Sequence, residues 1–108
     1  MKKISPSLLA ADFANLENEI KKVTQAGADF LHLDIMDGHF VPNLTFGPPV
    51  VAAIKKVAKI PLDVHLMIES PEKYVDEFIV AGSDYLTIHV ESTKFVGDIL
   101  KKIRSKNV

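Results

Sequence analysis

One short segment of the chain, residues 32–43, places a histidine and an aspartate directly before a loop rich in glycine, proline and asparagine. Its first residues alternate between polar and apolar, so in a strand His32, Asp34 and Met36 would share one face. An imidazole beside a carboxylate at the end of an otherwise apolar strand is costly to bury. Such a pair is typical of metal ligands or of an acid/base pair. Because active-site segments often lie in the loop after a strand, the pattern indicates an enzyme.

His65 occupies a similar position in a later apolar run, residues 61–67. Neighbouring parallel strands lie about 4.8 Å apart, so His32, Asp34 and His65 are predicted to converge on one ion. Two imidazoles and one carboxylate favour Zn, Fe, Mn or Co over Mg or Ca. Three protein ligands leave a further position for another protein group or a substrate oxygen. The alternative is that both histidines are ordinary strand residues that pack without binding a ligand.

Three more polar residues are expected near this centre. Ser7 lies towards the end of the first apolar run, at a matching depth. Asp63 shares the face of His65 but lies deeper, which favours orienting a ligand over acting as one. His89 faces the same mouth from the last apolar run, where it either acts as a metal ligand or contacts substrate, or else packs in the core or at the rim.

The loop and the two methionines have more ordinary explanations. The pair Asp37-Gly38 favours a turn. Residues 37–47 form a connection longer than the two to six residues usual between a strand and a helix, so this loop is expected to line or cover the site. Met36 and Met67 are predicted to pack in the core beside the proposed ion.

Four apolar runs alternate with four helical patterns, which predicts right-handed βαβ units and a parallel sheet. Gly27 is placed to end the first helix, and Pro48 and Pro49 suit the start of the second. Ser70 is the predicted N-cap of the third, followed by Pro71 at its first position. The expected strands cover residues 4–9, 30–36, 61–67 and 85–90, and the expected helices 16–27, 48–57, 70–81 and 94–106.

Composition is that of an ordinary globular protein, and the 108 residues are expected to form a single domain. The net charge of −1 gives no indication of nucleic acid or of a membrane surface as a partner. The lack of cysteine excludes disulfides, thiolate metal sites and a cysteine nucleophile. No apolar stretch has the length of a membrane span, and the expected location is the cytoplasm.

Four segments together resemble the ribulose-phosphate 3-epimerase family: residues 4–13, 32–43, 44–50 and 63–67. The resemblance covers essentially the whole chain in order. That family folds as a TIM barrel, a fold that needs about 200 residues or more. The resemblance therefore implies a (βα)4 half of a (βα)8 barrel, residues 1–108 being its N-terminal part.

The resemblance also implies an activity and the roles of several residues. The family interconverts D-ribulose 5-phosphate and D-xylulose 5-phosphate in the pentose phosphate pathway. By analogy, His32, Asp34 and His65 bind a divalent metal and Asp34 is also an acid/base, while Ser7, His32 and His65 contact the phosphorylated pentulose substrate. Met36 and Met67 would pack around the enediolate. Because the family's second aspartate and its phosphate site belong to later strands, the chain alone is expected to be inactive or weak.

Two alternative functions stay open on this sequence. One is an epimerase for a related hexulose 6-phosphate, and the other is a non-catalytic, metal-binding half-barrel that dimerises. Residues 26–31 and 81–86 are similar, either because junctions between a helix end and a strand converge on similar sequences or because the chain contains a repeated (βα)2 module, as in barrels built by duplication. Unpaired sheet edges invite pairing with another chain, so a homo-oligomer is expected, in which the partner's His65 would lie opposite Asp34.

Overall fold

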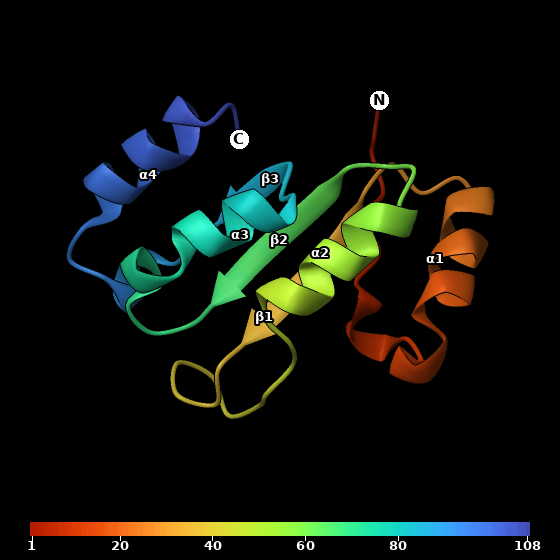
Figure 1. The fold of residues 1–108 in the computed structure, drawn as a ribbon, viewed down its shortest axis with the longest axis horizontal. Helices are drawn as coiled ribbons and strands as arrows, with labels where there is room; N and C mark the ends of the chain where they lie inside the picture. The colour runs from red at the N-terminus through yellow and green to blue at the C-terminus, as the bar shows by residue number, and fades with distance from the viewer.

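Three parallel strands, in the order β1-β2-β3, form the single sheet of the computed structural model, which describes residues 1–108. Figure 1 shows α2 and α3 in front of this sheet, with α1 and α4 on either side. The alternation of strands and helices confirms the predicted α/β class, an arrangement consistent with half of a TIM barrel. The elements are α1 (Leu16–Gln25), β1 (Leu31–Met36), α2 (Pro48–Val57), β2 (Leu62–Met67), α3 (Val75–Ala81), β3 (Tyr85–Thr87) and α4 (Val96–Ser105).

The alternation of side chains in β1 and β2 divides the sheet into an apolar and a polar face. In both strands every second residue is buried, and the residues between them are half-buried. The strands pair in register, so that His32 lies opposite Asp63 and Asp34 lies opposite His65. The polar residues of two strands therefore stand side by side at the same two levels of the sheet.

The apolar face packs against α2 and α3 to form the core. Full burial of one such aliphatic side chain contributes about 1.5–3 kcal/mol relative to leaving it exposed. This packing fixes the register of the strands, and with it the positions of the polar residues on the other face. The buried side chains at this contact are Leu31, Leu33, Ile35, Leu62, Val64, Leu66, Val51, Ile54, Val75 and Phe78.

The strand predicted at residues 4–9 is wrong. The segment lies beside β1, but only an isolated parallel bridge between Ser7 and His32 joins them. Pro6 has no N–H to give to a ladder, although its carbonyl accepts from the His32 backbone. The Ser7 hydroxyl then accepts from the Leu9 N–H, which turns the chain into a 3-10 helix at Leu8–Ala10.

The strand predicted at residues 85–90 is shorter than expected. β3 ends at Thr87, and a 3-10 helix occupies Val90–Ser92. The Ser92 hydroxyl donates to the His89 carbonyl, and the Ser92 backbone N–H donates to the same oxygen. These local hydrogen bonds replace the ladder, so the sheet has three regular strands in place of the predicted four.

Two of the predicted helices begin later than expected. Ser70 has a left-handed backbone (φ 49°), and its side chain makes no capping hydrogen bond. Its N–H donates to the Ser92 carbonyl, Pro71–Lys73 forms a 3-10 turn, and α3 begins only at Val75. The last helix starts at Val96, two residues beyond the predicted start.

None of the helices has the length and apolar character needed to cross a membrane.

Candidate metal centre and active site

The polar face of the sheet brings together the three side chains that the sequence predicted to converge. Asp34 Oδ1 lies 3.1 Å from His32 Nε2 and 3.1 Å from His65 Nδ1. The ligand atoms of the three residues all lie within 4.8 Å of one another. β1 supplies two of them and β2 the third, so the pairing of these strands sets the geometry.

Asp34 is the most enclosed member of the cluster, with 13% of its side chain exposed. Burial alone would raise its pKa. The hydrogen bond from Ser7 and the nearby His32 and His65 imidazoles outweigh burial, so the pKa of Asp34 lies below its ordinary value. The carboxylate therefore stays ionised at neutral pH, in the form that accepts a proton or binds a cation.

Ser7 reaches this carboxylate from the N-terminal segment. Its hydroxyl donates to Asp34 Oδ2 over 2.5 Å, on the side of the carboxylate away from the imidazoles. The bridge to His32 holds the serine in place although the expected strand is missing. The predicted position of Ser7 beside the cluster is thus reached through a turn.

Asp63 lies one level deeper, as its place in the strand predicted. Its Oδ2 lies 2.8 Å from His32 Nδ1 and also accepts a hydrogen bond from the Ser5 hydroxyl over 3.0 Å. A carboxylate at Nδ1 favours the tautomer with the hydrogen on Nδ1, which leaves the Nε2 lone pair facing Asp34. Ser5 belongs to a segment distant in sequence, and no sequence pattern pointed to its part in this network.

The donor set fits a divalent transition metal. A tetrahedral ion with bonds of about 2.0–2.1 Å requires ligand atoms about 3.3 Å apart. Asp34 Oδ1 lies close to this distance from both imidazoles, and all three ligand atoms are within 4.8 Å of one another. One ring nitrogen from each of two imidazoles and a carboxylate oxygen lie close together, an arrangement that a cation or intervening hydrogens stabilise. His32 Nε2, an oxygen of Asp34 and His65 Nδ1 are the atoms that could hold the ion.

Asp34 and His65 lie in the carboxyl-terminal halves of β1 and β2, towards the end of the sheet where α/β folds place their ligands. Met36 and Met67 are register partners at the ends of β1 and β2, one level beyond Asp34 and His65. Both are half-buried. They form an apolar border on the polar face beside the cluster.

His89 lies at the cluster although β3 ends before it. Its Nε2 is 2.6 Å from His65 Nε2, on the side of that ring away from Asp34. The Phe40 ring packs against it, with centroids 5.2 Å apart. His89 thus contacts one of the predicted metal ligands, His65, a role that was not among those predicted for it.

Asp37 forms the predicted turn and also ties two loops together. Its carboxylate accepts from the backbone N–H groups of His39, Phe40 and Glu69. Although desolvation alone would raise its pKa, these three donors hold the pKa of Asp37 below its ordinary value. Gly38, with φ 74°, takes the left-handed position of the turn.

Thr45 is a positioning residue that sequence reasoning missed. Its hydroxyl donates to the Asp34 carbonyl over 2.7 Å and accepts from the Met36 N–H over 3.0 Å. The returning loop thereby supplies the edge of β1 with hydrogen bonds at the level of the cluster. A threonine in a long loop carries no sequence signal for such a contact.

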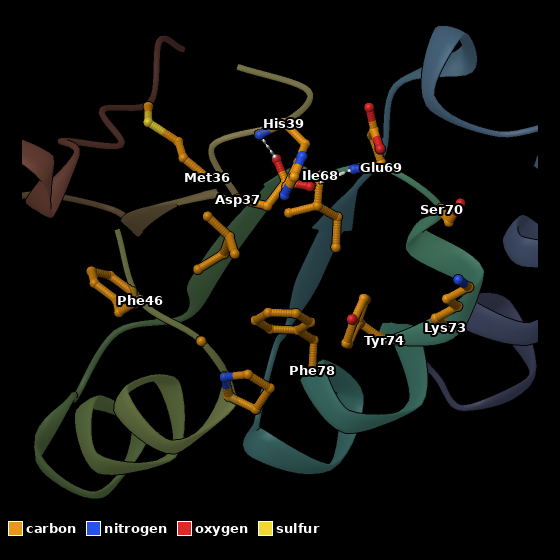
Figure 2. Close-up of a pocket in the computed structure, with 13 residues that line it drawn as sticks. Met36, Asp37, His39, Phe46, Ile68, Glu69, Ser70, Lys73, Tyr74 and Phe78 are labelled. Atoms are coloured by element: carbon orange, nitrogen blue, oxygen red, sulfur yellow. Dashed lines mark hydrogen bonds between the residues drawn. The ribbon is translucent and has the colours of Figure 1, made fainter. Parts of the chain in front are cut away.

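A pocket of about 450 Å³ lies at the ends of β1 and β2, between the loops and α3. Figure 2 shows Phe78 and Tyr74 of the 74–78 segment facing Asp37 and Ile68, with Met36 pointing away from Phe78. The ligand cluster is not part of its lining. This pocket is therefore separate from the candidate centre, which is an open polar face.

Comparison with known proteins gives consistent matches over this chain. The model of the "Ribulose-phosphate 3 epimerase family" matches residues 3–108. The chain is 50% identical over 108 residues to a ribulose-phosphate 3-epimerase of Bacillus subtilis, covering 100% of this chain and 50% of the relative. It is 52% identical over 103 residues to that of Rhodobacter capsulatus, covering 95% and 45%. The chain thus spans about half the length of these relatives.

Proposed function

Since the chain belongs to the ribulose-phosphate 3-epimerase family, we propose that its polar sheet face carries the metal ligands and one acid/base of an epimerase site. The substrate is a phosphorylated pentulose, and the reaction interconverts D-ribulose 5-phosphate and D-xylulose 5-phosphate by inversion at C3. The observation that carries this proposal is that ligand atoms of His32, Asp34 and His65 lie within 4.8 Å of one another.

Asp34 is the group that would remove the proton at C3. Its lowered pKa keeps it in the basic form, and the Ser7 hydroxyl holds one carboxylate oxygen in place. A divalent ion (Zn, Fe, Mn or Co) held by the three ligands supplies positive charge, which stabilises the negative charge that develops on the substrate oxygen. Met36 and Met67 provide an apolar wall beside the reacting carbons and restrict water there.

Inversion also requires an acid on the opposite face of the intermediate. The other carboxylate on the polar face, Asp63, is engaged by His32 and Ser5. No glycine-rich loop in these 108 residues is suited to anchor a phosphate. The second acid/base and the phosphate anchor would therefore come from other residues than these, and the 108-residue chain alone would turn over weakly.

The chain is also proposed to associate with a second copy of itself. β3 pairs with β2 alone and leaves one edge free, and Tyr85 on it is 52% exposed. A second copy paired at such an edge could bring the partner's His65 opposite Asp34. Light scattering that finds only monomers at high protein concentration would exclude this relation.

The test is proton exchange at C3 in D2O. The purified chain is incubated with Zn²⁺ and D-ribulose 5-phosphate, and deuterium at C3 is followed by NMR; a hexulose 6-phosphate is run in parallel. Incorporation is expected with the pentulose phosphate, and Asp34→Asn should abolish it because the amide is not a base. The matched variant Asp76→Asn, on the exposed side of α3, should exchange like the parent. Exchange no faster than in a protein-free control contradicts the proposal.

A further inference from the structure

His65 contacts polar groups through both of its ring nitrogens. Nδ1 faces Asp34 Oδ1 over 3.1 Å, and Nε2 faces His89 Nε2 over 2.6 Å. His89 in turn has Glu91 on its other side, with Oε2 3.7 Å from His89 Nδ1. Three contacts in series thus lead from the candidate metal site to an exposed carboxylate.

The two imidazole rings meet end to end. Their centroids are 4.9 Å apart and their planes differ by 27°. Ring bonds of about 1.33 Å place each ring atom about 1.1 Å from its centroid. Two such radii and the 2.6 Å nitrogen separation together account for the whole centroid distance. The two Nε2 atoms therefore lie nearly on the line between the centroids, in the geometry of a hydrogen bond and not of face-to-face stacking.

A contact of this kind between two neutral imidazoles holds one hydrogen. Two lone pairs at this distance would repel each other, and two N–H groups would collide. One Nε2 is therefore the donor and the other the acceptor. The tautomer of His65 consequently dictates the tautomer of His89.

Without a metal, the ionised Asp34 can only accept, so His65 donates from Nδ1. His65 Nε2 is then unprotonated and accepts from His89 Nε2–H. A metal at His65 Nδ1 requires that nitrogen to be unprotonated, which places the hydrogen of His65 on Nε2. His89 must then accept at Nε2 and carry its hydrogen on Nδ1, towards Glu91.

We propose that His89 is a positioning residue for His65, and that the two rings exchange tautomers together when a metal binds. The proposal rests on the metal site of the proposed function. Each ring keeps one N–H throughout, so the pair neither gains nor loses a proton. Glu91 favours the metal-bound arrangement because its carboxylate lies on the side where the His89 hydrogen arrives. Phe40, packed on the His89 ring, limits its rotation.

The experiment is two-bond ¹⁵N–¹H correlation NMR of the ¹⁵N-labelled chain, which distinguishes protonated from unprotonated ring nitrogens. Spectra are recorded without metal and with Zn²⁺. We expect His89 to change from the Nε2–H to the Nδ1–H tautomer on Zn²⁺ addition, although it is not itself a ligand. Zn²⁺-dependent shifts of His32 and His65 with an unchanged His89 tautomer overturn this proposal and leave the metal site intact. No Zn²⁺ binding overturns the metal site and this proposal with it.

Metal affinity gives a second and independent measurement. Loss of a partner to a ligating histidine weakens metal binding about 10–100-fold, and we expect this loss of Zn²⁺ affinity from His89→Ala. His89→Gln should recover most of it, because the amide oxygen can accept from His65 Nε2. The matched control His39→Ala, at an exposed histidine in the loop, should bind Zn²⁺ like the parent. Equal affinities for His89→Ala and the parent, with both folded by circular dichroism, overturn the proposal.

Discussion

Replacing Asp63 by asparagine tests whether a residue that contacts a metal ligand, without being a ligand itself, affects metal affinity. Asp63 Oδ2 accepts from His32 Nδ1 over 2.8 Å and from Ser5 over 3.0 Å. The variant keeps the side-chain volume but exchanges a charge-assisted hydrogen bond for a neutral one. The Nδ1–H tautomer of His32 is then less strongly favoured, and Nε2 is presented to the ion less often. Complete loss of such a partner weakens metal binding about 10–100-fold, which corresponds to about 1.4–2.7 kcal/mol. Because a neutral hydrogen bond is about half as strong as a charge-assisted one, we expect Asp63→Asn to weaken Zn²⁺ binding about 3–10-fold.

The assay is competition for Zn²⁺ between the protein and a chromophoric chelator at constant pH and salt. Asp76→Asn is the matched control, since Asp76 pairs only with Lys102 at a well-exposed position on α3. We expect the control to bind Zn²⁺ with the parent's affinity. If Asp63→Asn does the same while its fold is intact, Asp63 does not orient His32 for metal binding, and our account of the network is wrong.

Two further predictions concern stability and follow from contacts around the site and at the end of a helix. Because the pKa of Asp37 is lowered in the fold, its ionised form stabilises the protein above about pH 4, and this stabilisation is lost as the pH falls through the lowered pKa. Asp37→Asn should therefore lower the free energy of unfolding by about 1 kcal/mol at pH 7 in urea titrations, with a smaller difference at pH 3. Gly82→Ala should destabilise by about 1–3 kcal/mol, since Gly82 has φ 115° and a Cβ there would lie 2.6 Å from Lys55 Cγ. The control Gly97→Ala, in a helix with nothing within 4 Å of the new Cβ, should raise the melting temperature.

The sequence predicted β1 and β2 well because their alternation is imposed by burial on one face only. The same period placed His32, Asp34 and His65 on one face, and parallel pairing then made their convergence a matter of strand spacing. These features depend on neighbours in sequence and on one pairing, both of which can be inferred from a pattern.

The features that were missed depend on contacts between distant segments or on competing local hydrogen bonds. Ser5 and Thr45 acquire their places only when the N-terminal segment and the long loop fold back onto the sheet. The segment at residues 4–9, expected as a strand, turns away because the Ser7 hydroxyl accepts from the Leu9 backbone N–H. Serine is a common N-cap residue, but the backbone N–H of Ser70 donates to the Ser92 carbonyl in the 3-10 helix at residues 90–92.

Because side chains alternate strictly along β1 and β2, substitutions at alternate positions affect two different properties of the protein, its packing and its chemistry. Odd and even positions of each strand face opposite sides, so a single substitution alters either the packing or the chemistry and leaves the other nearly unchanged. Insertion or deletion of one residue is different, since it would turn every later side chain to the opposite face at once. Point mutation can therefore tune this site gradually, whereas a change in the length of either strand must destroy packing and chemistry together.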